Sequence, residues 1–344
     1  MGATKVNSRY LTYVAVAITV VAIVSAVFAY TYYNAQIVDL QQKIETLENT
    51  VAAQENELSK YRNLTLVDDH GFVLKLSSYP QRIISTAPSC TEILFALGVG
   101  DKVVGVDDYS NYPYNFSEWI KAGNMTSIGG FSTPNTEVIV SLKPDLILTA
   151  GTLNDENAKT WRSMGCNVLA LDPHDINGVL QDIMLVGRAT GSEAQAASLV
   201  NSINARINAV FEKLAGVTEK PKVYYEIWYD PLMSVGASAW ENQLIEKAGG
   251  VNIFANQSEQ YFITSSEVIV SLNPDVILLP SSHGLGAPFW GSIDQVKARA
   301  GWSSISAVKN GRLYVVDSDI ITRAGPRIAD AIEMLAKIFH PELF

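Results

Sequence analysis

Cysteine, histidine and clustered basic residues are all scarce in this sequence, and each shortage argues against a class of function. The two cysteines, Cys90 and Cys166, form no CxxC pair and no zinc-type spacing. Two isolated buried thiols are therefore expected, with a disulfide between them as the alternative. A net charge of −10 without a basic stripe argues against nucleic acid as a partner. The histidines are scattered, which disfavours a bare metal-ion site. They are His70, His174, His283 and His340.

A hydrolytic site also lacks its signature. No Gly-x-Ser-x-Gly nucleophile elbow occurs anywhere in the chain. Ser281-Ser282-His283 and Asp172-Pro173-His174-Asp175 contain residues of a triad, but solvated loop histidines explain both segments more simply. The sequence therefore favours a binding protein over an extracellular hydrolase, and no cofactor other than a bound ligand is expected.

Apolar residues, in contrast, are abundant. Of 344 residues, 48% are hydrophobic and 17% are charged, which is ample for a packed core. The length predicts two domains with additional segments.

The first additional segment is a predicted membrane anchor at residues 10–33. It contains no Asp, Glu, Lys or Arg, and as a helix it would rise about 36 Å, enough to cross a bilayer. Lys5 and Arg9 precede it, so residues 1–9 are expected in the cytoplasm and the rest outside. The alternative is a signal peptide cleaved after Val27-Phe28-Ala29, which would release a secreted or periplasmic protein.

A helical stalk is predicted next, at residues 34–63. Glycine and proline are absent from residues 37–61, and apolar residues occupy heptad a and d positions, with only Gln54 out of pattern. They are Ile37, Leu40, Ile44, Leu47, Val51, Leu58 and Tyr61. The pattern favours a coiled-coil homodimer, and a single amphipathic spacer helix is the alternative.

From residue 64 the pattern is that of an α/β protein. A hairpin is predicted around Asp68-Asp69-His70-Gly71, followed by strands at 82–86, 102–106, 146–149 and 168–171 that alternate with helices. Helices near 89–97 and after 192 carry capping-box spacing at Ser89–Glu92 and Ser192–Gln195. We predict an N-terminal lobe at 64–175, a helical backbone at 176–215 interrupted at Gly191, and a C-terminal lobe at 216–344.

An internal repeat supports two related lobes. The segment EVIVSLKPDLIL at 137–148 returns as EVIVSLNPDVIL at 267–278, and ten of its twelve positions match. Each copy predicts a short helix, a proline stop and a buried parallel strand. Two such lobes make a cleft, where ligand sites are common. Glu137 and Glu267 begin the two helices, where a carboxylate also simply suits the helix dipole.

Several motifs together resemble one transport family. RIISTAPSCTEILFALG at 82–98, DYSNYP at 108–113, the two repeat segments, AGGVNIF at 248–254 and RAGPR at 323–327 occur in the order typical of helical-backbone (class III) ABC-importer substrate-binding proteins. The resemblance covers about residues 66–344. It implies two Rossmann-like lobes with parallel sheets bridged by one long helix. It also implies that Glu137 and Glu267 dock onto arginines of the permease, where paired charges orient the partner.

Within this class the cobalamin-binding members are the most similar. Tyr109, Phe131 and Tyr261 match positions at which those members present aromatic rings to the corrin, although the last two are tryptophans there. Arg323 matches a polar position on the cleft rim. Three further cleft candidates follow strands or lie in nearby loops: Trp228, Trp240 and Trp290.

The ligand and the surroundings of the protein stay open at this point. A corrinoid is expected first, a ferric siderophore bound by Arg323 and Arg327 second, and haem with an axial Tyr109, Tyr261 or His283 third. A surface receptor or scaffold that has lost transport is a further alternative. Sequons for glycosylation occur at Asn63, Asn115, Asn124 and Asn256.

Overall fold

The computed structural model describes residues 8–59, 64–151, 155–281 and 290–344, which fall into two separate units. The first unit, residues 1–62, contains one helix, α1 (Ser8–Ser59). The predicted anchor and the predicted stalk are thus one uninterrupted helix as far as Ser59. Asn63, Tyr61 and His283 lie outside the described residues.

The membrane anchor is not shown by the structure. Side chains of residues 8–20 and 22–24, which make up much of the predicted span, fall outside the description. Where the chain is described, no helix meets the length and apolarity needed to cross a bilayer. A coiled coil is likewise not shown, since only one copy of the chain is present.

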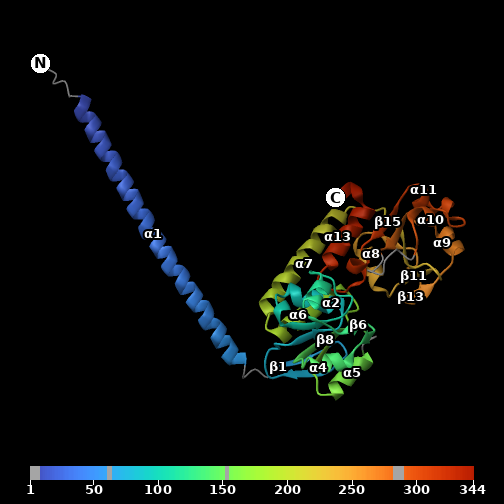
Figure 1. Ribbon diagram of the computed structural model, residues 1–344. Coiled ribbons are helices and arrows are strands. Elements are labelled where there is room, and N and C mark those ends of the chain that lie inside the picture. The colour runs from blue at the N-terminus through green and yellow to red at the C-terminus, as the bar shows by residue number, and fades with distance from the viewer. Residues whose placement is uncertain (1–7, 60–63, 152–154, 282–289) are drawn as a thin grey trace. The chain divides into compact units, whose positions relative to one another are not determined.

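The second unit, residues 63–344, starts with the predicted hairpin, β1 (Leu64–Val67) paired with β2 (Val73–Leu76). We call residues 64–175 the N-terminal lobe (Figure 1). Its five-stranded sheet is wholly parallel, in the order β5 (Thr126–Ser127), β4 (Val103–Val106), β3 (Ile83–Ser85), β8 (Leu146–Ala150) and β9 (Val168–Leu171). Nearly every residue of β3, β8 and β9 is buried, as expected for a sheet covered on both faces. The alternation of strands and helices in the sequence predicted this sheet correctly.

Helices and a small ribbon complete this lobe. The helices are α2 (Pro88–Ala96), α3 (Phe116–Lys121), α4 (Thr136–Ser141) and α5 (Asp155–Ser163), with a 3-10 turn η1 (Gly100–Lys102). The ribbon pairs β6 (Gly129–Gly130) with β7 (Thr133–Pro134).

We call residues 216–344 the C-terminal lobe; its sheet is mixed. The order is β13 (Tyr261–Ile263), β11 (Met233–Val235), β10 (Lys222–Trp228), β14 (Val276–Pro280) and β15 (Leu313–Val316), and β12 (Val251–Asn252) also pairs with β10. Strands β12, β14 and β15 are parallel to their neighbours, whereas β11 and β13 run antiparallel. The helical elements are α8 (Trp240–Lys247), α9 (Ser266–Leu272), α10 (Ile293–Lys297), η3 (Trp302–Ser304), α11 (Ser306–Lys309), α12 (Ser318–Thr322), α13 (Ile328–Phe339) and η4 (Pro341–Leu343).

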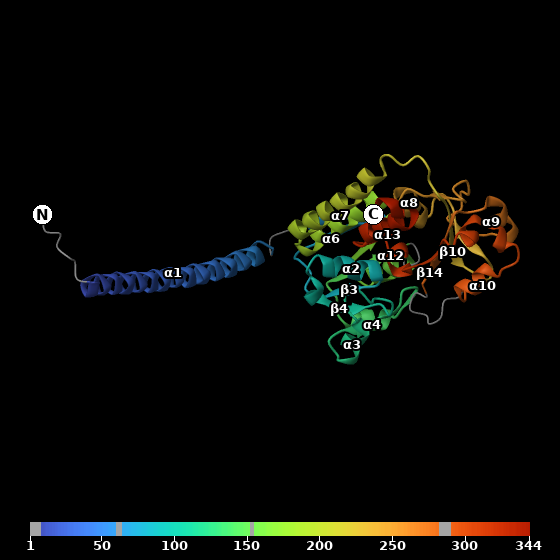
Figure 2. The ribbon, with the colours of Figure 1, turned by 90° about the horizontal axis from the view of Figure 1, so that it is seen from above.

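Two packed helices connect the lobes. α6 (Ile176–Thr190) and α7 (Glu193–Leu214) lie along each other, and α13 packs on α7 (Figure 2). Gly191 separates them with φ at 75°, a left-handed conformation that suits glycine. One continuous set of buried apolar side chains includes Val186 of α6, Ile203 of α7 and Ile332 of α13. The long backbone is therefore a helix pair with one break, as the glycine predicted.

The internal repeat is confirmed by matching local structure. Helices α4 and α9 both begin at a side-chain cap, where Asn135 accepts from the Val138 N–H and Ser265 accepts from the Val268 N–H. Two indole N–H groups reach the first residues of these helices. Trp161 donates to the Thr136 hydroxyl at 3.1 Å, and Trp302 donates to the Ser266 hydroxyl at 3.2 Å. The two lobes thus hold their repeated helices in the same way, with tryptophans that lie outside the repeated sequence.

Both predicted capping boxes are wrong. α2 begins with Ala87 as its N-cap and no side-chain cap, because Pro88 occupies the first helical position. The Ser192 side chain does not cap α7; its hydroxyl bonds instead to the Thr190 hydroxyl at 2.7 Å. Spacing alone does not exclude a competing partner for these short side chains.

Candidate functional site

A cavity of about 380 Å³ opens where the N-terminal sheet faces the end of α12. Its walls come from the ends of β8 and β9, from the segments that follow β3, β4, β8 and β9, from the turn between β6 and β7, and from α12 with the turn after it. The carboxyl ends of parallel strands meet at one sheet edge, which is the usual ligand position in such folds. The lining residues are Pro88, Ser89, Tyr109, Phe131, Ser132, Ala150, Gly151, Leu171, Asp172, Pro173, Asp319, Thr322, Arg323 and Ala324.

Three of the residues proposed from the sequence meet in this cavity. Tyr109, Phe131 and Arg323 all line it, and the Tyr109 side chain is 47% exposed. Tyr261 does not line it; it lies in a separate hollow on β13, where its hydroxyl donates to Glu241 Oε2 at 3.4 Å. Burial raises the pKa of Glu241 to about 7. Of the three aromatic residues proposed to contact the ligand, the structure therefore brings Tyr109 and Phe131 together at this cavity and places Tyr261 elsewhere.

The three tryptophan candidates do not line the cavity. Trp228 is 44% exposed, and its indole N–H donates to the Asp230 carbonyl. Trp240 is buried and donates to the Ile321 carbonyl at 2.9 Å, which ties α8 to α12. Trp290 is buried and donates to the Pro280 carbonyl. Trp240 therefore supports the cavity from behind, through the helix that bears Asp319 and Thr322.

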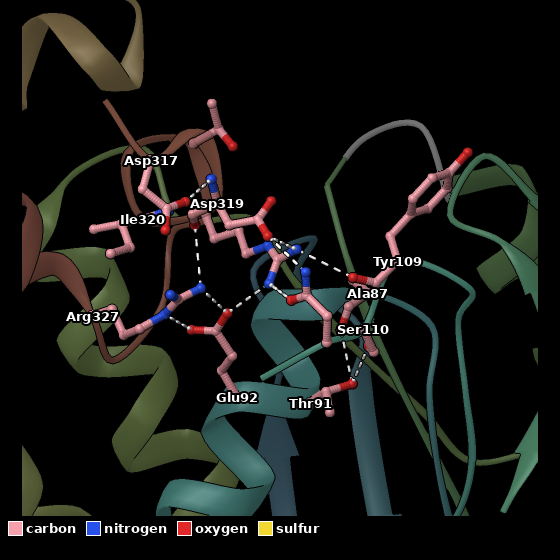
Figure 3. A network of polar contacts seen from close by, with 12 residues as sticks. Ala87, Thr91, Glu92, Tyr109, Ser110, Asp317, Asp319, Ile320 and Arg327 are labelled. Carbon is pink, nitrogen blue, oxygen red and sulfur yellow. Dashed lines mark hydrogen bonds and ion pairs between the residues drawn. The ribbon is translucent and has the colours of Figure 1, made fainter. Parts of the chain in front are cut away.

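Arg323 carries the only positive charge among the described lining residues, and acceptors surround it. Figure 3 shows the polar network to which it belongs, with Glu92, Asp319 and Tyr109 labelled. Its Nη1 lies 3.0 Å from Glu92 Oε1 and 2.8 Å from Asn111 Oδ1. Its Nη2 lies 3.1 Å from the Tyr109 carbonyl oxygen and 3.0 Å from Asp319 Oδ2. The guanidinium thus joins the C-terminal lobe to the loop that positions Tyr109, whose ring points away from this network.

A second guanidinium completes the network. Arg327 Nε donates to Glu92 Oε2 at 2.9 Å and its Nη2 donates to Glu92 Oε1 at 2.6 Å, a bidentate pair. The same guanidinium lies 4.3 Å from the centre of the Tyr112 ring. The Glu92 side chain is 1% exposed, so it is an interlobe ion-pair residue rather than the helix cap that its spacing predicted. Its partners lie more than 200 residues away along the chain, so no local pattern could have identified them.

Acidic residues gather beneath the opposite wall. Asp172 lines the cavity, and its carboxylate lies 3.7 Å from His70 Nε2, while His70 Nδ1 lies 3.1 Å from Asp155. The Asp172 N–H donates to Asp69, which neighbours the buried Asp182 of α6. Burial, the Asp69 charge and a hydrogen bond to Asp69 raise the pKa of Asp182 to about 9. Asp182 is therefore protonated and uncharged at neutral pH.

Neither a metal centre nor a disulfide emerges from the described residues. Among them, no three His, Cys, Asp or Glu side chains are grouped so as to hold a metal ion. Cys90 is a buried free thiol, and Cys166 is a free thiol that is partly exposed. The expectation of two unpaired cysteines is confirmed, although only Cys90 is buried.

The two repeated glutamates lie on the surface of different lobes. Glu137 is in the first turn of α4 and Glu267 is in the first turn of α9, two helices labelled in Figure 1. Both side chains are exposed. A hydrogen bond with Ser265 lowers the pKa of Glu267, so this carboxylate is ionised at neutral pH. A polar hollow lies beside Glu267, and Ser265, Ser266 and Asp230 contribute to its lining.

Comparison with known proteins gives a consistent family. Residues 83–320 match the family model described as periplasmic binding protein. An uncharacterised ABC transporter substrate-binding lipoprotein of Bacillus subtilis is 34% identical over 82% of this chain and 87% of its own length. A cobalamin-binding protein of Halobacterium salinarum is 30% identical over 80% of this chain and 74% of its own. The structure of the periplasmic heme-binding protein RhuT from Roseiflexus superposes with a TM-score of 0.67 at 27% identity, covering 77% of this chain and 99% of that one.

Proposed function

Because this chain belongs to the periplasmic binding protein family, and is thus an ABC-importer substrate-binding component and not an enzyme, we propose that its ligand is a corrinoid held in the interlobe cavity. The protein works outside the cytoplasmic membrane and hands the ligand to its permease. Relatives that bind cobalamin support this proposal, as do the motifs of the sequence.

The charge of the cavity wall is the observation that favours a corrinoid over an anionic ligand. Its described charged residues are Asp172, Asp319 and Arg323, one cation against two carboxylates. Arg323 is already bonded to Glu92 and Asp319. An anionic ferric siderophore needs an uncompensated cation, and this wall supplies none among the described residues. Tyr109 and Phe131 instead offer rigid apolar area to a broad, largely uncharged ring system.

Haem is the second candidate. The observation in its favour is the Tyr109 side chain at the cavity, because a tyrosine oxygen can serve as an axial ligand of haem iron. The likeness to a heme-binding protein supports the same reading.

Direct titration tests the proposal. The full-length chain in detergent is titrated with cyanocobalamin, cobinamide, haem and a ferric tris-hydroxamate, and tryptophan fluorescence is followed. We expect sub-micromolar saturation by a corrinoid alone. Tyr109→Ala or Phe131→Ala should weaken that binding about 10- to 100-fold, because burying an aromatic side chain contributes about 1.5–3 kcal/mol.

Tyr261→Ala is the matched variant for this titration, since Tyr261 is exposed to a similar extent and does not line the cavity. Unchanged affinity in this variant would restrict the site to the first cavity. Saturation by haem or by the hydroxamate instead of a corrinoid would overturn the assignment of the ligand.

The membrane anchor and the dimeric stalk belong to the same proposal. The charge-free run at residues 10–33 supports the anchor. The described heptad side chains of α1 are at least half exposed within this chain, so that their apolar stripe is open to a second copy. These residues are Ile37, Leu40, Ile44, Leu47 and Val51.

Retention of the anchor predicts a specific mature form. We expect the mature protein to stay in the membrane pellet after alkaline extraction, and its intact mass to include residues 10–33. A mass that begins after Ala29, with the protein in the soluble fraction, would instead establish a cleaved signal peptide.

A further inference from the structure

Arg323 is the one cation on the described cavity wall, yet its hydrogen-bonding capacity is nearly exhausted. Its two terminal nitrogens carry four N–H groups, and four acceptors lie within 3.1 Å of them. Two of these acceptors belong to Tyr109 and Asp319, which line the cavity, and the third belongs to Asn111, two residues after Tyr109. The fourth, Glu92, does not line the cavity and reaches Arg323 from α2 beneath it.

Glu92 also holds the second guanidinium of this network. Its carboxylate binds Arg327 in bidentate fashion and Arg323 through Oε1, and almost none of its side chain is exposed. In such a desolvated setting, ion pairs are much stronger than in water. Glu92 and Asp319 together balance Arg323 and Arg327, so that neither guanidinium presents an uncompensated charge.

We propose that Glu92 is a specificity-determining residue that acts through Arg323. By neutralising Arg323 from beneath, Glu92 keeps the cavity closed to carboxylate- or catecholate-bearing ligands and open to ligands with an uncharged rim. This inference rests on the proposed function only in taking the cavity as the ligand site. Specificity is a difference between affinities, and a buried counter-ion changes that difference without touching the ligand.

Glu92→Gln in the full-length chain tests the inference, because glutamine keeps the shape of the side chain and removes the charge. The first probe is inorganic phosphate, which requires no knowledge of the natural ligand. Phosphate should raise the melting temperature of Glu92→Gln by more than it raises the melting temperature of the wild type, each compared with a phosphate-free buffer of equal ionic strength. The second probe is a ferric tris-catecholate trianion, whose affinity should rise at least about tenfold, the scale of one gained charge-assisted hydrogen bond.

Two controls separate charge from folding. In the double variant Glu92→Gln/Arg323→Gln, both gains should vanish, because the released guanidinium is gone. Glu241→Gln removes another carboxylate that is 3% exposed and does not line the cavity, and it should give neither gain. Arg323→Gln alone should shift preference the other way, toward cationic diaquacobinamide over neutral cyanocobalamin.

Each outcome decides the inference. A folded Glu92→Gln protein that binds phosphate and the trianion no better than the wild type would show that Glu92 is only structural. If Glu92→Gln does not fold, an unchanged preference in Arg323→Gln would overturn the inference equally. Failure of cyanocobalamin to bind the wild type would remove the corrinoid assignment, while the phosphate comparison still judges Glu92.

Discussion

Replacing Glu137 and Glu267 together by alanine should abolish ligand uptake and leave ligand binding unchanged. Both carboxylates are exposed, and each lies in the first turn of the repeated helix of its lobe. If the permease presents arginines to this pair, loss of both charges removes the contacts that orient the two proteins and accelerate their encounter. Uptake of labelled ligand into cells or proteoliposomes, measured beside solution affinity, separates docking from binding.

The structure also indicates that these variants will fold. The side-chain caps of the two helices come from Asn135 and Ser265, and the indole bonds go to Thr136 and Ser266, so neither glutamate carries them. Glu156→Ala is the matched control. It removes an exposed carboxylate from the first turn of α5 in the same lobe as Glu137, where its partner is Lys159. Full uptake by the double variant would eliminate the docking role.

The stability of the protein should fall as pH rises from about 4 to about 9, and among the buried carboxyl groups with raised pKa values Asp182 should contribute most. The pKa of Asp182 is raised from 3.8 to about 9, chiefly by burial and then by Asp69. Between these values the unfolded chain has released this proton and the folded protein still holds it. Unfolding then releases a proton, so increasing pH favours the unfolded state. Since one pKa unit corresponds to about 1.4 kcal/mol, this contribution amounts to several kcal/mol.

Asp182→Asn should remove the largest single contribution to this slope, while Asp107 and Glu241, whose pKa values are raised to about 6 and about 7, keep a smaller part of it. Asparagine is neutral at every pH and can still donate a hydrogen bond to Asp69. The variant should therefore resemble the wild type near pH 4 and be more stable near pH 8, as measured by urea unfolding across that range. Asp175→Asn is the control, because Asp175 is the exposed N-cap of the same helix and asparagine caps equally well. An unchanged slope in Asp182→Asn would assign the pH dependence to another group.

Much of the fold was predictable because its signals are local. Buried strands at 146–150 and 168–171 are short apolar runs, and the helix break at Gly191 follows from the conformation that glycine tolerates. The repeat was visible in the sequence, and the structure repeats its backbone conformation as well. Lys143 and Asn273, at equivalent positions of the two copies, have positive φ values of 49° and 47°. The capping boxes failed because they too were judged locally, whereas Glu92 has stronger partners elsewhere.

The candidate site was predicted only in part. Tyr109, Phe131 and Arg323 line one cavity, and these came from family motifs. Trp228, Trp240 and Trp290 lie elsewhere in the described structure, because a position after a strand does not say which way a side chain turns. Tyr261, which came from the family motifs, lines a separate hollow on β13. Asp172 was considered only as part of a triad-like segment, although it directly follows β9 and lines the cavity.

The sequence by itself determined the α/β class, the internal repeat and the family, since hydrophobic periodicity, helix- and strand-breaking residues and ordered motifs are properties of neighbouring residues. Only the tertiary structure decided which charges meet. Glu92 and Arg323 are separated by 231 residues, and Glu92 and Arg327 by 235. Their pairing arises where α2 meets the turn after α12. Burial at that contact strengthens the two ion pairs, and through them Glu92 neutralises the charge that Arg323 presents to the cavity.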